Sequence, residues 1–154
     1  MMNTYIIGTG FLSNNIKKKI NHSEVLSAKE FFNKINLINI KKKKINLIIN
    51  SFYSSRKLNT TTSFKKFTKK SIYDISEILD KINPILIQKI IYTSSSAVYG
   101  SIISKIKIND LNNRYLYSSF KLAAETMFKN YCNKNDINLD ICRVFNIYGN
   151  EDNF

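Results

Sequence analysis

Short, largely apolar segments alternate with longer segments of helical spacing along this 154-residue chain. A strand with apolar residues at successive positions is buried on both faces, which is typical of a parallel sheet covered by helices on each side. We therefore predict an α/β fold with a doubly wound parallel sheet and helices on both faces. The expected strands are Thr4–Ile7, Glu24–Leu26, Ile45–Asn50, Lys89–Thr93 and Leu139–Val144.

Three segments are predicted to be helices: Phe11–Ile20, Ser63–Asn83 and Tyr115–Asn133. The second ends just before Pro84 and carries an apolar stripe at helical spacing, which favours a place in the core or between helices. The members of this stripe are Ile72, Ile75, Ile78, Leu79 and Ile82. Because we find no repeat and no low-complexity linker, we expect one domain over residues 1–154.

The formal net charge of +13 comes almost entirely from lysine, since arginine supplies only three of the 24 basic residues. A nucleic-acid groove favours arginine with interleaved aromatic residues. The densest run, Lys41–Lys44, has no aromatic neighbour, so we expect no nucleic-acid partner. A basic nucleic-acid binder remains an alternative, and it predicts binding that weakens steeply with salt.

Cys132 and Cys142 are too few for a disulfide framework, which favours a reducing compartment. The N-terminus lacks the pattern of a signal peptide, and no apolar stretch is long enough to span a membrane. We therefore expect a cytoplasmic protein with no membrane partner.

A glycine turn, Gly8-Thr9-Gly10, lies between the first predicted strand and the first predicted helix. Glycine permits a tight turn and a close approach of a pyrophosphate, and the amide groups that open a helix attract anions. Ser13 occupies the third small position, where helix and strand pack together. On its own this pattern is also explained by an ordinary turn between a strand and a helix.

Tyr117 and Lys121 are four residues apart, which places them on one face of the predicted helix. An ammonium group stabilises a phenolate and lowers the pKa of a tyrosine, so such a pair can exchange a proton with a substrate hydroxyl while a hydride moves to a nicotinamide. The pattern alone is unspecific, because Tyr53 and Lys57 repeat it.

A run of hydroxyl groups follows the predicted strand Lys89–Thr93, in the block YTSSSAVYG. A doubly wound sheet binds its ligands at this end of its strands. Ser95 in this block could donate to the same substrate hydroxyl that Tyr117 deprotonates. A serine-rich loop without a function is the alternative interpretation.

Taken in order, the glycine turn and the blocks YTSSSAVYG, YSSFKLAAE and RVFNIYG make the chain resemble the extended short-chain dehydrogenase/reductase family. That family includes the NAD-dependent sugar-nucleotide epimerases and dehydratases. The resemblance covers nearly the whole chain. It implies an NAD(P)-binding Rossmann domain, a cytoplasmic enzyme acting on a nucleotide sugar, and no metal.

The resemblance also implies roles for single residues. Ser95 matches the catalytic serine or threonine, Tyr117 the acid/base, and Lys121 the lysine that lowers the tyrosine pKa and binds the nicotinamide ribose. Asn146, with Ser95, matches residues that contact the substrate. The residues expected to contact the cofactor are Gly8, Gly10, Phe11, Leu12, Ser51, Tyr117, Lys121 and Phe145.

Within the family, dehydratases carry an acid directly after the catalytic serine or threonine. Ser96 and Ala97 stand there in this chain, which favours epimerase or reductase chemistry over dehydration. The family also pairs the helices that match Ser63–Asn83 and Tyr115–Asn133 in a four-helix dimer interface, so a homodimer through these helices is a further implication.

The chain departs from the family in several places. Ile7 and Ser13 stand at the first and last positions of its Gly-x-x-Gly-x-x-Gly turn. Ser27 is the nearest match to the aspartate that accepts from the adenosine ribose, and Lys29 could meet a 2′-phosphate, so both NAD and NADP stay open. The bulky pair Phe52-Tyr53 follows Ser51 where the family has small residues.

The largest departure is length, because family members continue for roughly as many residues again and build much of the substrate pocket from them. The chain is therefore expected to lack the C-terminal substrate-binding portion, either as a fragment or part of a split enzyme, or as a minimal cofactor-binding domain. A truncated or degenerate nucleotide-binding module without catalysis is the alternative function.

Overall fold

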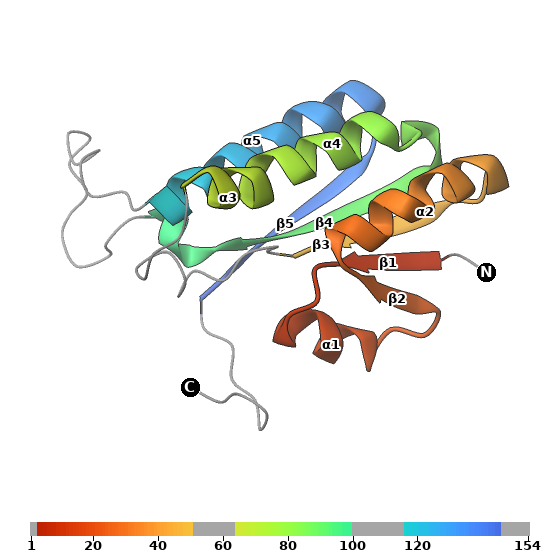
Figure 1. Ribbon diagram of the computed structural model, residues 1–154, viewed down its shortest axis with the longest axis horizontal. Coiled ribbons are helices and arrows are strands. Elements are labelled where there is room, and N and C mark those ends of the chain that lie inside the picture. Colours follow the sequence, from red (N-terminus) through yellow and green to blue (C-terminus); the bar gives the residue numbers. More distant parts are fainter. Residues whose placement is uncertain (1–2, 51–63, 100–115, 146–154) are drawn as a thin grey trace.

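The computed structural model describes residues 3–50, 64–99 and 116–145. In this part of the chain five strands form a sheet in the order β2-β1-β3-β4-β5 (Figure 1). Every neighbouring pair in it is parallel. The strands are β1 (Asn3–Ile7), β2 (Ser23–Leu26), β3 (Ile45–Ile49), β4 (Ile87–Ser95) and β5 (Asn138–Val144).

Helices cover both faces of the sheet, as predicted. One face carries α1, and the other carries α2, α3, α4 and α5 (Figure 1). Their bounds are α1 (Phe11–Lys17), α2 (Ala28–Lys41), α3 (Phe64–Thr68), α4 (Asp74–Lys81) and α5 (Leu116–Asn135). In the described residues, none of these helices has the length and apolar character that crossing a membrane requires.

The main core fills the space between the sheet and the layer of α2, α4 and α5. Fully buried side chains such as Leu47, Ile90 and Phe128 form it. Four members of the predicted apolar stripe (Ile75, Ile78, Leu79 and Ile82) are buried there as expected, and the fifth, Ile72, is half-buried.

The direction in which the chain winds reverses between β1 and β3. The connection through α1 leads from β1 to β2 on one side, and the connection through α2 leads back past β1 to β3. Doubly wound sheets bind ligands outside the carboxyl ends of the strands at such a reversal. The glycine turn after β1 and Asn50 after β3 both lie at this point.

Helix α2 is absent from the sequence-based prediction, although its start carries a clear signal. The Ser27 side chain accepts a hydrogen bond from the Glu30 amide, and the Glu30 carboxylate accepts one from the Ser27 amide. This capping box satisfies two amide groups that the helix itself leaves without acceptors. Ser27, expected near the adenosine ribose, is therefore the N-cap of a helix.

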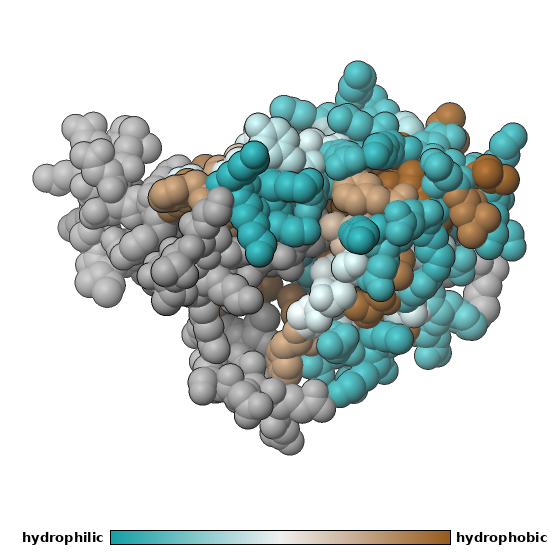
Figure 2. All heavy atoms as spheres, in the orientation of Figure 1, coloured by the Kyte–Doolittle hydropathy of each residue, from teal (hydrophilic) through white to brown (hydrophobic). Residues whose placement is uncertain are grey.

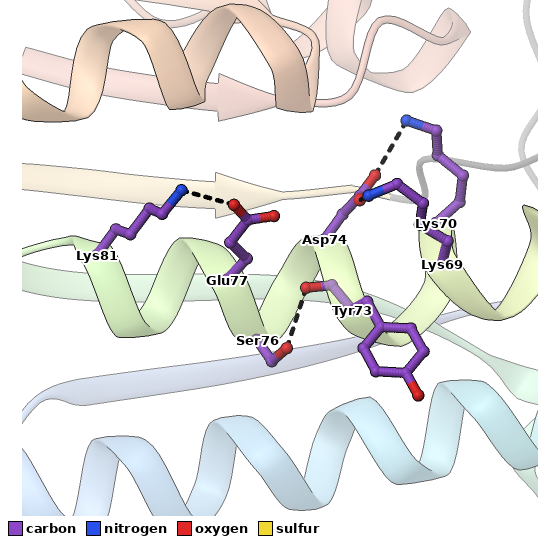
Figure 3. A network of polar contacts seen from close by, with 7 residues as sticks. All are labelled: Lys69, Lys70, Tyr73, Asp74, Ser76, Glu77 and Lys81. Carbon is purple, nitrogen blue, oxygen red and sulfur yellow. Dashed lines mark hydrogen bonds and ion pairs between the residues drawn. The ribbon is translucent and has the colours of Figure 1, made fainter.

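The predicted helix over residues 63–83 contains a π-helical turn, Lys69–Tyr73, between α3 and α4. Asp74 follows this turn and is only 2% exposed. Its two carboxylate oxygens accept from Lys69 and Lys70, each at 3.0 Å (Figure 3). Buried carboxylates require such partners, and π-turns are often found near functional sites.

Candidate functional site

The glycine turn bends sharply and leaves its backbone accessible. Gly8 adopts φ 112°, which side chains rarely tolerate, and its amide donates to the Leu26 carbonyl at 2.8 Å. Gly10 is the N-cap of α1, and a Cβ added there would meet no atom within 4 Å. Phe11 and Leu12 follow, half-buried, in the first turn of α1. The turn therefore leaves open space above Gly10.

A buried polar cluster lies beneath this turn. Ser13 is 1% exposed, and its hydroxyl oxygen accepts from Nδ2 of Asn50 at 2.6 Å. Oδ1 of Asn50 accepts from the Thr93 hydroxyl at 2.8 Å. From the sequence Ser13 was expected to have a packing role only, and Asn50 and Thr93 were expected to be strand residues, so this cluster was not predicted.

Ser95 is the last residue of β4 and is half-buried. Its hydroxyl oxygen accepts from the Ala97 amide at 3.2 Å, which leaves the hydroxyl proton available for another acceptor. The 3₁₀ turn that follows, Ser96–Tyr99, is in contact with α5. Ser95 thus lies at the carboxyl end of the sheet, next to the element that carries Tyr117 and Lys121.

Lys121 is almost completely buried, with 6% of its surface exposed. Its ammonium group donates to the Thr93 carbonyl at 2.6 Å and lies 5.9 Å from the Tyr117 ring centroid and 4.8 Å from that of Tyr92. Burial lowers the pKa of Lys121 to about 8, although the nearby Glu125 carboxylate acts in the opposite direction. A lysine cation therefore faces a half-buried tyrosine one helical turn away.

An ion pair with a buried carboxylate lies at the same end of the sheet. Glu125, fully buried on α5, accepts from Nε and Nη2 of Arg143 at 3.0 and 2.7 Å. Burial, the largest single effect, would raise the pKa of Glu125, but the hydrogen bonds and charge of Arg143, together with Ser94 and Lys129, outweigh it and lower that pKa. Glu125 lies one turn after Lys121 in the block YSSFKLAAE, and its role was not predicted from the sequence.

Aromatic rings continue from this pair to the surface. The Arg143 guanidinium group lies 4.7 Å from the Tyr99 ring centroid, and Tyr99 stacks on Phe145 with centroids 6.2 Å apart. Phe145, expected beside the nicotinamide, is 64% exposed directly after β5. These residues therefore lie at the carboxyl ends of β4 and β5.

Several predicted residues lie outside the described part of the chain. These are Ser51 with the bulky pair Phe52-Tyr53, the second pattern Tyr53 and Lys57, and the substrate residue Asn146. Within the described residues, no group of three or more His, Cys, Asp or Glu side chains could hold a metal ion.

The fold is shared with solved sugar-nucleotide enzymes at low sequence identity. A UDP-N-acetylglucosamine 4-epimerase from Methanobrevibacter ruminantium M1, in complex with UDP-N-acetylmuramic acid, aligns over 96% of this chain and 56% of its own with a TM-score of 0.69 and 19% identity. A UDP-glucuronic acid 4-epimerase from Bacillus cereus in complex with NAD aligns over 97% and 57%, with a TM-score of 0.61 and 17% identity.

A GDP-D-glycero-L-gluco-heptose synthase from Campylobacter jejuni, in the presence of NADPH, aligns over 98% of this chain and 49% of its own, with a TM-score of 0.66 and 13% identity. The chain thus spans about half the length of these structures. Among curated proteins none matches this sequence significantly. Residues 11–154, however, match the NAD dependent epimerase/dehydratase family, and the chain therefore belongs to that family.

Proposed function

We propose that the chain carries the cofactor half of an NAD(P)-dependent, epimerase-type oxidoreductase that acts on a nucleotide-linked sugar. Family membership over residues 11–154 supports the general class of reaction. The observation that carries the proposal is the buried Lys121 cation beside Tyr117, at the end of the sheet where the glycine turn also lies. A buried lysine is costly, and such residues occur where chemistry requires them.

The residues of the turn fit a dinucleotide. Gly8 makes the sharp bend, and the open space above Gly10 allows a pyrophosphate to approach the backbone closely. The chain lacks the usual acid at the end of β2, since Ser27 caps α2 there. The carboxylate of Glu30 lies beside Ser27, whereas Lys29 would favour a 2′-phosphate, and we therefore propose binding of NAD or NADP without choosing between them.

A bound nicotinamide would supply hydride acceptance and return. The residues of this chain would handle the proton: Tyr117 takes it from the sugar hydroxyl, and the Lys121 cation stabilises the phenolate that forms before the transfer. Ser95, whose hydroxyl proton is not used by its bond to Ala97, would donate to the oxygen that loses the proton. In the return step Tyr117 delivers the proton back to that oxygen.

Epimerase or reductase chemistry fits this site better than dehydration. A dehydratase needs a group that protonates the departing hydroxyl, and the positions after Ser95 offer none with that ability. Ala97 has no titratable side chain, and its amide is engaged with Ser95. A serine at position 96 is too weakly acidic to serve as the proton donor at neutral pH.

The chain spans about half the length of the solved structures. A nucleotide-binding module without catalysis is the second candidate, and it is favoured by Ile7, Ser13 and Ser27, which stand where the family has two glycines and an acid. The two candidates differ in turnover and agree in cofactor binding.

Calorimetric titration of the chain with NAD and with NADP tests the proposal. Saturable binding of either cofactor is expected, and binding of neither would refute it. If an activity assay with nucleotide sugars shows turnover, Tyr117→Phe should abolish it and leave the cofactor Kd nearly unchanged, since only the hydroxyl group is lost. Cofactor binding without turnover is the result that the non-catalytic module predicts.

We also propose a cytoplasmic homodimer that pairs α4 and α5 with their copies. Exposed aromatic residues near these helices, Phe64 at 75% and Tyr73 at 62%, support an interface here. The side of the molecule seen in Figure 2 shows small apolar patches among hydrophilic side chains. Light scattering after size exclusion at several concentrations would detect the dimer.

The cysteines support the proposed cytoplasmic location. Cys132 and Cys142 are both free, which suits a reducing compartment.

A further inference from the structure

Asn50 occupies a place where three elements of the site meet. It follows β3 at the reversal of the sheet, and its main-chain amide donates to the Ile7 carbonyl at the end of β1 at 2.9 Å. Its side chain donates to Ser13 on α1 and accepts from Thr93 on β4. One residue thereby joins the ends of the three central strands and the helix that follows the glycine turn.

All members of this cluster are shielded from water. Ser13, Asn50 and Thr93 are exposed by 1%, 5% and 8%. A hydrogen bond in such surroundings has no competing water, and breaking it leaves its partner unsatisfied. The amide of asparagine suits this place because its NH₂ group donates to the Ser13 hydroxyl oxygen while its carbonyl oxygen accepts from the Thr93 hydroxyl group.

The cluster extends to the proposed catalytic lysine through a single residue. Thr93 donates with its side chain to Asn50 and accepts with its carbonyl from Lys121 at 2.6 Å. The glycine-turn helix α1 and the lysine-bearing helix α5 cover opposite faces of the sheet (Figure 1). The hydrogen bonds from Ser13 to Lys121 therefore pass through the sheet, from the cofactor turn to the catalytic group.

We propose that Asn50 is a positioning residue, which through the buried bridge Ser13–Asn50–Thr93 holds the glycine turn and the Lys121 ammonium group in fixed relation to one another. This inference rests on the proposed function, in which the turn binds the pyrophosphate and Lys121 serves Tyr117. Ser13 thus has a role that glycine or alanine at the same position could not perform. Its hydroxyl group anchors the far end of the bridge.

The pKa of the Lys121 ammonium group should change when the bridge is broken. The groups near it are Tyr92 on β4 and Tyr117 and Glu125 on α5, and the bridge variants below leave all three in place. A carbonyl acceptor stabilises the charged form of lysine. Loosening Thr93 should therefore lower the pKa of Lys121 below its value of about 8.

The test is an NMR titration of ¹⁵N-lysine-labelled protein without cofactor, with the Lys121 signal assigned by its loss in Lys121→Met. Ser13→Ala and Thr93→Val, which break the bridge at its two ends, should both lower the Lys121 pKa. Thr93→Ser restores the hydroxyl and should keep the wild-type value. Thr4→Val, which changes a buried threonine at the other end of β1, is the matched control and should also keep it.

Cofactor titrations of the same proteins complete the test. Each bridge variant should weaken the affinity about 5- to 10-fold, as expected for one lost hydrogen bond, and the double variant should be no weaker than either single variant. An unchanged Lys121 pKa in Ser13→Ala would overturn the inference, because a cluster that only stabilises the fold would lower stability and leave the lysine alone. If the wild-type chain binds neither cofactor, the proposed function fails, while the lysine titration still decides on the bridge.

Discussion

The Arg143→Met substitution removes the cation from the buried carboxylate of Glu125 and keeps most of the arginine side-chain volume. The side chain of Glu125 has no exposed surface, whereas that of Arg143 is 29% exposed. Removing one partner of a buried ion pair costs about 3–5 kcal/mol. Because water can reach the position of Arg143, we expect the lower end, about 3 kcal/mol, or a loss of roughly 6–12 °C in Tm for a chain of this size.

The pH dependence of this loss follows from the pKa of Glu125. In the wild type that pKa is lowered, so the carboxylate contributes stability above the ordinary value of 4.5, and this contribution is lost as the pH falls through the folded pKa. In the variant the hydrogen bonds and the charge of Arg143 are gone while burial still opposes ionisation, so the pKa of Glu125 should rise above its wild-type value. The difference between the two proteins should therefore be largest at neutral pH and shrink towards pH 4.5.

Urea unfolding followed by circular dichroism at pH 7 and pH 5 measures this difference. The double variant Glu125→Leu/Arg143→Met should recover most of the loss, because it removes both charges of the pair and leaves neither without its partner. Lys81→Met is the matched control: it breaks the exposed pair with Glu77 seen in Figure 3 and should change stability by at most about 0.5 kcal/mol. A loss that is equal in the single and double variants and independent of pH would refute the reasoning.

Two further predictions concern the glycine turn and the buried Lys121. Lys121→Met should raise the free energy of unfolding at pH 7 by roughly 2 kcal/mol, since burial lowers the Lys121 pKa to about 8 and the folded protein must bear a desolvated cation. The gain in stability should become smaller as the pH rises from 8 towards 10.5. Thermal unfolding of both proteins at pH 7 and pH 10 measures it, and a variant that is less stable than the wild type at pH 7 would contradict the prediction. Gly8→Ala should destabilise the chain by about 1–2 kcal/mol because φ is 112° there. Gly10→Ala, with φ −79° and open space around the added methyl group, should change stability by less than about 0.5 kcal/mol, and equal losses in the two variants would contradict this geometry.

Much of the fold could be predicted from the sequence, because strands that are buried on both faces of the sheet appear as runs of mostly apolar residues. Ile45–Ile49 and the centre of β4 are runs of apolar residues, and they form central strands as expected. Helix α2 was not predicted, although Ser27 and Glu30 form a capping box that indicates its start. The reason is that Ser27 was interpreted as the match to the adenosine-binding acid of the family. The π-turn before Asp74 was not predicted, because the apolar spacing of the segment indicated one continuous helix.

Part of the candidate site could likewise be predicted from the sequence, and part could not. Gly8, Ser95 and Lys121 stand next to strand ends or at helical spacing, so local sequence was sufficient to select them. The bond between Asn50 and Ser13, and that between Glu125 and Arg143, join elements far apart in the chain. Only the sheet order brings those partners together, and neither composition nor spacing encodes it. The segments with Ser51 and Asn146 lie outside the described residues, and their roles remain predictions.

The Gly10→Asp substitution tests most directly the claim that the glycine turn binds a dinucleotide. Aspartate is a favourable N-cap residue, and its Cβ would meet no atom within 4 Å, so the free energy of unfolding should stay equal or rise by a few tenths of a kcal/mol. Its carboxylate would fill and charge the space above the turn that we assign to the pyrophosphate. Calorimetric titration should therefore show wild-type binding of NAD or NADP and none by the equally stable variant. Undiminished cofactor affinity in Gly10→Asp would contradict the account.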